Sequence, residues 1–234
     1  MAKSVMSRIF VTGDMHGSDS IKKFNKENFP IGESLTKEDI VIVLGDFGLV
    51  WDDSKEENYW LDWLDSKEWT TMFIDGNHEN FDLLYKTKVM EHKDNMLRKI
   101  RNSVFHIPRA TLLEIDNKVL FCFGGAESVD RGIRTEFKNW WKQELPTLSE
   151  MNEGLDNLES ANYFVDYVLT HTCPLEIMSS IVDPVYSSPT NHSFERYLSA
   201  IRESVDCKWY FGHYHKDKTI GKNTAVYDKI IELK

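Results

Sequence analysis

Three apolar segments of this chain, 8–12, 40–44 and 71–74, each run into a short polar turn at a nearly constant interval. Asp14, Asp46 and Asn77 stand in these turns, 32 and then 31 residues apart. An interval of about 30 residues is the length of a βαβ unit, which brings parallel strands back to the same edge of a sheet. The spacing therefore predicts an α/β fold in which the three turns lie side by side.

Histidines accompany these residues and also follow two later apolar segments, 163–169 and 208–211. The carboxyl ends of neighbouring strands in an α/β sheet open onto a common crevice, so side chains that are distant in sequence can meet there. Oxygen and imidazole ligands without a thiolate suit a pair of divalent metals such as Mn, Fe or Zn. We expect the following side chains to converge: Asp14, His16, Asp46, Asn77, His78, His171, His213 and His215.

The remaining segments predict helices and a second sheet. The β-branched run 40–44 is typical of a central strand that is buried on both faces. Thr147 and Glu150 are in capping-box register at the start of a helix. Helices are expected at 18–26, 56–65, 81–85, 147–160 and 191–203, a charged connection at 86–101, and strands at 104–107, 110–115, 118–123 and, two or three in number, within 216–233.

Residues 126–146 lack a regular period and are predicted to form a long excursion from the core, which in compact domains is often a lid. Trp140 and Trp141 are interpreted as an apolar plug that holds the excursion down, with stacking on a nucleobase as the less favoured alternative. Nothing in the sequence marks a linker, so residues 1–234 are predicted to form a single domain.

Composition narrows the classes of partner and compartment. The formal charge of -10 disfavours a protein that holds nucleic acid by broad backbone contacts. Three cysteines without a Cys-x-x-Cys pair indicate neither a disulfide framework nor a thiolate zinc site. The N-terminus lacks a signal-peptide pattern, and no stretch approaches the roughly 20 apolar residues of a membrane span. We therefore expect a cytoplasmic protein without a membrane partner, and no oligomeric state follows from the sequence.

Five ordered motifs resemble the signature of the calcineurin-like metallophosphoesterase superfamily. They are Asp-x-His at 14–16, Gly-Asp at 45–46, Gly-Asn-His-Glu at 76–79, a lone His at 171 and Gly-His-x-His at 212–215. The stretches VIVLGDFGLVW and FIDGNHENFDLL are also similar to small bacterial or bacteriophage members. The resemblance implies a four-layer α/β/β/α sandwich of two mixed β-sheets, with a dinuclear metal site at the carboxyl ends of the strands.

The resemblance also implies a role for each residue in these motifs. Asp46 would bridge the two metals, and His78 would be the catalytic imidazole. The first metal would be bound by Asp14, His16, Asp46 and His215. The second metal would be bound by Asp46, Asn77, His171 and His213.

The implied activity is hydrolysis of a phosphomonoester or phosphodiester bond in a small phosphorylated substrate, by in-line attack of a hydroxide that bridges two divalent metals. Mn is the first expectation for these metals, with Fe or Zn as alternatives. A metal-dependent nuclease and a nucleoside-polyphosphate hydrolase stay open, as does a catalytically silent metal-binding scaffold. No ligand position is substituted, which favours an enzyme over the scaffold.

The second motif departs from the protein-phosphatase branch. That branch continues as Gly-Asp-x-x-Asp-Arg-Gly, whereas Leu49, Val50 and Trp51 fill the last three positions here. A phosphatase acting on phosphoserine or phosphothreonine in proteins is therefore not expected. Arg131 or Arg134 of the excursion is a candidate replacement for the missing arginine, because a guanidinium binds phosphate as a bidentate fork. The alternative is that both belong to a solvated loop.

Overall fold

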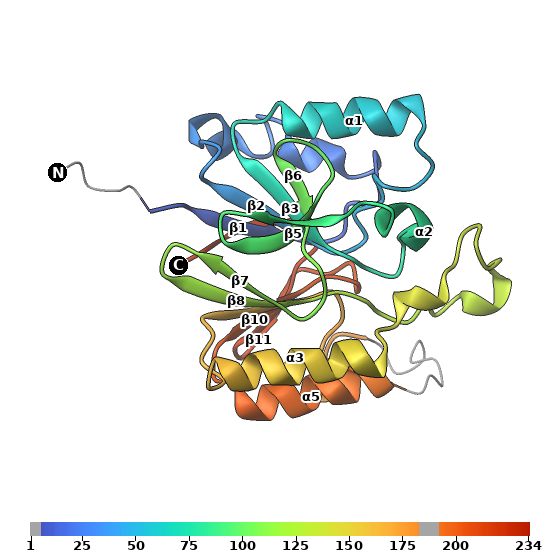
Figure 1. The fold of residues 1–234 in the computed structure, drawn as a ribbon, viewed down its shortest axis with the longest axis vertical. Coiled ribbons are helices and arrows are strands. Elements are labelled where there is room, and N and C mark those ends of the chain that lie inside the picture. Colours follow the sequence, from blue (N-terminus) through green and yellow to red (C-terminus); the bar gives the residue numbers. More distant parts are fainter. Residues whose placement is uncertain (1–5, 183–191) are drawn as a thin grey trace.

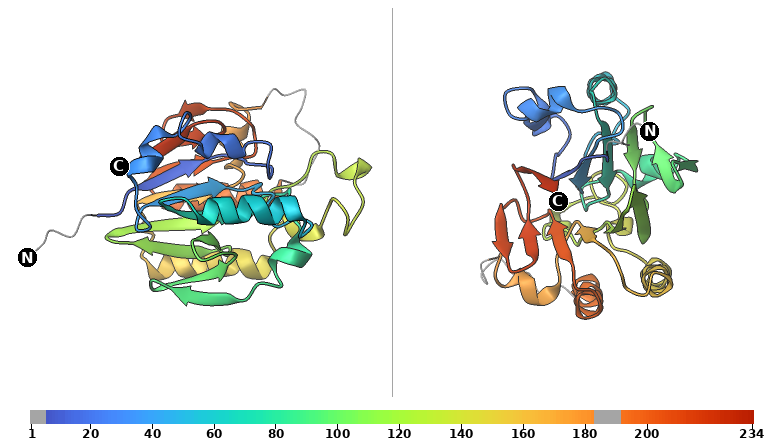
Figure 2. Two further views of the ribbon diagram at one scale, coloured as in Figure 1. Left: turned by 90° about the horizontal axis from the view of Figure 1, so that it is seen from above. Right: turned by 90° about the vertical axis from the view of Figure 1, so that its left-hand side faces the viewer.

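The computed structural model describes residues 6–182 and 192–234, which form two β-sheets stacked face to face with helices on both outer sides (Figure 1). Helix α1 (Lys55–Asp65) lies outside the first sheet, and α3 (Leu148–Ser160) and α5 (Ser193–Ser204) lie outside the second. The right-hand view of Figure 2 looks along these helices and shows the same layers. The predicted four-layer α/β/β/α sandwich is confirmed.

The first sheet is mixed and has seven strands in the described residues. Strands β1, β2, β3 and β6 run parallel to one another, and β13, β5 and β4 pair antiparallel at its two sides. In spatial order the strands are β13 (Ile230–Leu233), β1 (Ile9–Thr12), β2 (Ile40–Leu44), β3 (Thr70–Ile74), β6 (Val104–His106), β5 (Asn95–Lys99) and β4 (Val89–His92).

The second sheet is also mixed, with six strands in the same described part of the chain. Strands β12, β10, β9 and β8 are parallel, and the edge strands β11 and β7 are antiparallel to their neighbours. In spatial order the strands are β11 (Lys218–Ile220), β12 (Asn223–Ala225), β10 (Lys208–Phe211), β9 (Tyr167–Thr170), β8 (Lys118–Phe123) and β7 (Thr111–Ile115).

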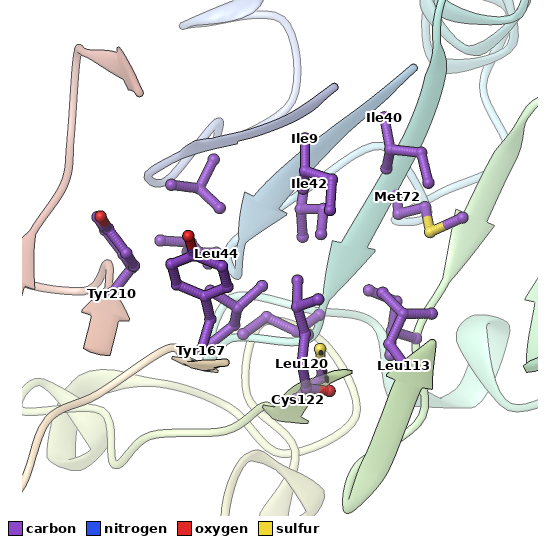
Figure 3. Close-up of a cluster of buried hydrophobic side chains, with 14 of the residues drawn as sticks. Ile9, Ile40, Ile42, Leu44, Met72, Leu113, Leu120, Cys122, Tyr167 and Tyr210 are labelled. Atoms are coloured by element: carbon purple, nitrogen blue, oxygen red, sulfur yellow. Dashed lines mark hydrogen bonds between the residues drawn. The ribbon is translucent and has the colours of Figure 1, made fainter. Parts of the chain in front are cut away.

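The main core lies between the two sheets (Figure 3). Ile40, Ile42 and Leu44 of β2 point into it, while Val41 and Val43 of the same strand pack under the outer helical layer. Successive strand residues face opposite sides of a sheet, so an uninterrupted apolar run fits a strand that is covered on both faces. Burying one such side chain stabilises the fold by about 1.5–3 kcal/mol.

The helices confirm most of the sequence predictions. Thr147 and Glu150 form the expected capping box at the start of α3. Short helices occur at α2 (Phe81–Leu84), as expected, and at α4 (Leu175–Met178) and η2 (Pro30–Ser34), which were not expected. The helix predicted over 191–203 is α5, and Asn191 lies outside the described residues. Among the described residues, no helix is both long enough and apolar enough to cross a membrane.

The helix predicted at 18–26 is wrong, because only a single 3-10 turn forms there, η1 (Ile21–Phe24). Ile21 and Phe24 are buried, and Lys23 Nζ donates to the carbonyls of Gly13 and Asp14 at 3.3 and 2.9 Å. These contacts hold the segment against the turn that follows β1. A longer helix would carry it away from that turn.

Two strand predictions also need correction. The charged connection at 86–101 contains the hairpin β4–β5, whose turn residues Lys93 and Asp94 both have positive φ, as tight hairpin turns require. Its strands lie at the edge of the sheet, and β4 is mostly exposed, so no apolar alternation marks it. The strand predicted from 163 begins only at Tyr167, because Asn162 and Tyr163 adopt positive φ and bend the chain.

The excursion at 126–146 projects from the body beside α2 (Figures 1 and 2) and contains two short 3-10 turns, η3 (Arg131–Ile133) and η4 (Lys142–Glu144). Trp140 and Trp141 are 8% and 2% exposed. Trp141 Nε1 donates to Asp82 of α2 at 2.9 Å. The two tryptophans therefore anchor the excursion as predicted, and its role as a lid stays a prediction.

Candidate metal centre

All five motif turns lie at the carboxyl ends of parallel strands. The turns that follow β1, β2 and β3 come from the first sheet, and those that follow β9 and β10 come from the second. Gly45 and Gly76 let these turns approach each other closely. A Cβ atom on Gly45 would lie 2.2 Å from His171 Nδ1, and one on Gly76 would lie 2.1 Å from Asp46 Oδ1. Only glycine fits at either position.

One group of candidate ligands consists of Asp14, His16 and His215. Nε2 of His16 lies 2.9 Å from Nε2 of His215, and Oδ2 of Asp14 lies 3.0 Å from the latter nitrogen. The three ligand atoms are within 4.8 Å of one another. One cation can therefore be reached by all three.

A second group consists of Asp14, Asp46 and His171, with Asn77 beside it. Nε2 of His171 lies 3.3 Å from Oδ1 of Asp46 and 3.1 Å from Oδ1 of Asn77. Nδ1 of His171 is 2.7 Å from the Leu44 carbonyl, which can only accept a hydrogen bond. Nδ1 therefore carries the proton, and in the neutral ring Nε2 is left as a ligand nitrogen.

Asp46 faces both groups. Its Oδ2 lies 3.8 Å from Nε2 of His16, and its Oδ1 lies 3.3 Å from Nε2 of His171. Oδ1 also accepts the backbone N–H of His78 at 2.8 Å, which fixes the plane of the carboxylate. One carboxylate is thus directed towards two adjacent places where a cation fits.

The donor set fits a pair of divalent cations. Oδ2 of Asp14 is buried and makes no hydrogen bond of good geometry within the described residues, and its nearest candidate neighbour, Nε2 of His215 at 3.0 Å, belongs to the same first group. Uncompensated burial of such an atom is costly, and a cation would remove that cost. All the ligand atoms are oxygens or imidazole nitrogens, which suit Mn, Fe or Zn.

Charge is balanced between the acids and the imidazoles of the centre. Burial opposes ionisation of Asp14 and Asp46, but His171 together with the other histidines around them outweighs it, and both pKa values lie below the usual range. Burial also opposes protonation of His171, yet the two carboxylates raise its pKa to about 9. The carboxylates therefore favour a positive charge between them, as a cation site requires.

The backbone is strained at this place. His16, Asp46, His213 and His215 all have positive φ, between 48° and 67°. Such a conformation costs about 1–3 kcal/mol per residue, and it persists where surrounding contacts enforce it, often at functional sites. Here it occurs in the turns that carry the candidate ligands.

Among the predicted histidine ligands, all of them described residues, His213 enters neither group of three. Its ring lies next to that of His171, with 5.0 Å between centroids, and its backbone N–H donates to Oδ1 of Asp14 at 2.8 Å. Burial and the neighbouring charge on His171 lower the pKa of His213 to about 4. Its neutral ring therefore adjoins the second group, and its role as a ligand stays a prediction.

His78 lies at the edge of the centre and is half-buried. Its ring is 5.3 Å from that of His16, centroid to centroid, in an edge-on arrangement. Burial is the main cause of a lowered pKa of His78, and the neighbouring Arg134 lowers it further. The structure thus places beside this imidazole a guanidinium from the excursion.

Sequence reasoning missed Ser128 and Glu144, which orient the candidate ligand Asn77. Nδ2 of Asn77 donates to Oγ of Ser128 at 3.1 Å, and that hydroxyl donates to Oε2 of Glu144 at 2.5 Å. All three residues are buried. Ser128 follows the carboxyl end of β8, a parallel strand, and this position is the signal that could have identified it.

A buried ionic network supports the turn that bears Asn77. Oδ2 of Asp75 accepts from Nε and Nη2 of Arg109 at 2.8 and 2.6 Å, and Oδ1 lies 3.2 Å from Nε2 of His106. Burial opposes ionisation of Asp75, but Arg109 and His106 together lower its pKa to about 2. His106 is thus a buried strand residue with a structural partner. His92, in turn, stacks on Phe105, with 4.2 Å between ring centroids.

Comparison with known proteins identifies the family of this chain. The family model described as calcineurin-like phosphoesterase matches residues 7–217. A search of curated proteins gives no match. Among solved structures, the chain is similar to a putative 5'-nucleotidase from Staphylococcus aureus in complex with alpha-ketoglutarate, at 14% identity and a TM-score of 0.47. That match covers 95% of this chain and 48% of the other, so this chain spans about half the length of its neighbour. By its family match, the chain belongs to the calcineurin-like phosphoesterases, which are metal-dependent phosphoester hydrolases.

Proposed function

We propose that the chain hydrolyses a phosphomonoester or phosphodiester bond of a small phosphorylated molecule at a pair of divalent cations. The observation that carries this proposal is the position of Asp46, whose two carboxylate oxygens face the two ligand groups. When bound, two such cations lower the pKa of water towards about 7 and neutralise charge on a phosphoryl group. Mn is the proposed metal, with Fe or Zn as alternatives.

The ligands are divided between the two cations as the family motifs imply. Asp46 belongs to both sets and would therefore set the distance between the two cations. The first set is Asp14, His16, Asp46 and His215, three of which form the first group of ligand atoms. The second set is Asp46, Asn77, His171 and His213, of which Asp46 and His171 belong to the second group.

His78 is the proposed proton donor to the leaving oxygen. Its backbone N–H donates to Oδ1 of Asp46, so the main chain that carries the imidazole is held beside the candidate ligands. A lowered pKa makes the protonated imidazole a stronger acid, and imidazole side chains serve as general acids in catalysis. It would bind no cation itself and would act on the substrate.

The charge of the chain supports a small substrate over nucleic acid. A net charge of -10 disfavours binding by broad contacts with a phosphate backbone. A nuclease reaction at the same cations is an outcome that the substrate test below can reveal.

Hydrolysis of p-nitrophenyl phosphate and of its bis-ester, measured after chelation and again after addition of Mn, tests the proposal. Activity is expected to disappear with chelator and to return with Mn. His78→Ala is expected to lower kcat by about 10²- to 10⁴-fold with unchanged metal content. A parallel panel of a cyclic nucleotide, a dinucleoside polyphosphate and single-stranded DNA identifies the substrate class. Loss of metal in His78→Ala, or no hydrolysis of any substrate with Mn, Fe or Zn, contradicts the proposal.

A further inference from the structure

Arg134 of the excursion reaches His78 at the edge of the metal centre. Its Nη1 lies 3.2 Å from Nδ1 of His78, and its Nη2 lies 3.2 Å from Nε2. The Arg134 side chain is 14% exposed, although most of the residues around it in the excursion are exposed. A positive charge from a distant part of the chain is therefore placed beside the imidazole that is proposed to meet the substrate.

Contacts within the excursion fix the direction of this guanidinium. Oδ1 of Asp130 accepts from Nε of Arg134 at 2.6 Å, and the carbonyl of Asn139 accepts from Nη1 at 3.0 Å. Within residues 6–182 and 192–234, Nε2 of His78 is the one polar atom in hydrogen-bonding range of Nη2. The Nη2 end of the fork is thus directed at the site.

The base of the excursion is itself fixed to the body. The N–H of Ala126 donates to the carbonyl of Glu144 at 3.1 Å, and Nη2 of Arg109 donates to the carbonyl of Gln143 at 2.7 Å. Trp141 adds the bond to Asp82 of α2. The two ends of the excursion are thus bonded to each other, and its second end is bonded to Arg109 and Asp82 of the body. These contacts hold the segment that carries Arg134 beside the site.

The two contacts between Arg134 and His78 cannot both be hydrogen bonds. A neutral imidazole has one acceptor nitrogen and one N–H, a protonated one has no acceptor, and a guanidinium has donors only. At least one N–H of Arg134 therefore faces another donor. A phosphoryl oxygen in contact with Nε2 of His78 would lie within reach of Nη2 of Arg134. That oxygen would accept a hydrogen bond from the Nη2 N–H, which has no such acceptor in the imidazole.

Arg131, the other arginine of the excursion, has a different contact. Its guanidinium carbon lies 4.4 Å from the ring centroid of Trp140, and the side chain is otherwise exposed. A cation over an indole face is a stabilising contact in its own right. The two arginines, which the sequence could not tell apart, are thus separated by their surroundings.

We propose that Arg134 binds the non-bridging oxygens of the substrate's phosphoryl group and holds that group against His78. Asp130 is a positioning residue that aims the guanidinium. The inference rests on the proposed function for the identity of the ligand, a phosphoryl group. In the protein-phosphatase branch the second motif continues with Asp-Arg-Gly, where this chain has Leu49, Val50 and Trp51. By this inference, Arg134 of the excursion takes over the role of the arginine that is missing there.

The test uses the Mn-loaded protein and has two readouts, calorimetric binding of inorganic phosphate and steady-state hydrolysis of p-nitrophenyl phosphate. Arg134→Ala is expected to weaken phosphate binding and to raise KM by about 10- to 100-fold each, because a charge-assisted hydrogen bond is lost. Arg134→Lys keeps the charge but loses the fork, so we expect an intermediate affinity. Thermal unfolding and Mn content are expected to stay unchanged in both variants.

Lys138→Ala is the matched control, because it removes one positive charge from an exposed position of the same excursion. We expect it to bind phosphate as the natural chain does, since an exposed charge is screened by salt. Unchanged affinity in Arg134→Ala, or an equal loss in Lys138→Ala, overturns the inference. A loss in Arg131→Ala with none in Arg134→Ala also overturns it.

Two further outcomes separate this inference from the proposed function. If the natural chain binds phosphate through Arg134 but hydrolyses no ester, the proposed function fails and the inference stands. If Arg134→Ala does not fold or loses Mn, Arg134→Gln decides, because it keeps a hydrogen-bond donor without the charge. An affinity in Arg134→Gln equal to that of the natural chain would then refute the inference.

Discussion

Replacing Ser128 with Ala removes the group that orients the candidate metal ligand Asn77. The Ser128 hydroxyl accepts from Nδ2 of Asn77 at 3.1 Å and donates to Oε2 of Glu144 at 2.5 Å. Without it, the Asn77 amide loses the contact that directs its Oδ1 towards His171. Oε1 of Glu144 keeps the backbone N–H of residue 128 at 3.1 Å, so the turn itself is preserved.

The magnitude follows from burial. Ser128 is 4% exposed and Asn77 is 5% exposed, so water cannot fully replace the lost hydroxyl. A buried donor left without a partner costs about 1–3 kcal/mol, and loss of a residue that orients a metal ligand typically lowers metal affinity about 10- to 100-fold. We expect Ser128→Ala to show both effects.

The assay pairs a calorimetric Mn titration with urea unfolding of the metal-free protein. Ser204→Ala is the control, because its exposed hydroxyl on α5 bonds only the carbonyl of Ala200, at 3.4 Å, among the contacts within the described chain. Its stability should change by no more than about 0.5 kcal/mol. If Ser128→Ala lowers stability but binds Mn as tightly as the natural chain, the hydroxyl does not orient a ligand and the reasoning is refuted.

Three further predictions concern stability. Asp75→Asn should destabilise the protein by about 3–5 kcal/mol in urea unfolding, because it leaves Arg109 buried and unpaired. The double variant Asp75→Asn with Arg109→Met should recover part of the lost free energy of unfolding. A double variant whose loss equals the sum of the two single losses would contradict the pairing. The folded pKa of Asp75, about 2, lies below its ordinary value, so its contribution of about 2 kcal/mol is present above about pH 4 and is lost as pH falls towards 2. Between pH 4 and pH 2, the free energy of unfolding should therefore fall less steeply in Asp75→Asn than in the natural chain. An equal fall in both proteins would contradict this contribution of Asp75. Mn at 100 times its dissociation constant should raise the free energy of unfolding by about 2.7 kcal/mol, and no shift would mean that no site binds it.

The positions of the strands and of the candidate ligands at their ends could be predicted because both depend on short-range patterns. The run 40–44 had to be a strand buried on two faces, and its polar successor Asp46 had to lie at the carboxyl end of that strand. The same reasoning placed Asn77, His171 and the other ligands at neighbouring strand ends. Glycine at positions 45 and 76 allowed the close approach that these ends require.

What could not be predicted depends on contacts between segments that are distant in sequence. Nothing local distinguishes Arg134 from Arg131; only the path of the excursion brings one to His78 and the other onto Trp140. Ser128 is likewise a common type of loop residue, and only its position after β8 brings its hydroxyl to Asn77. The hairpin β4–β5 was not predicted because an exposed edge strand needs no alternation of apolar and polar residues.

The central claim is that Asp46 lies between two cations. The most direct measurement is an anomalous difference map from crystals grown with Mn. We expect two Mn peaks on either side of the Asp46 carboxylate, one beside His16 and the other beside His171. A single peak, or two peaks of which neither contacts Asp46, would contradict the claim.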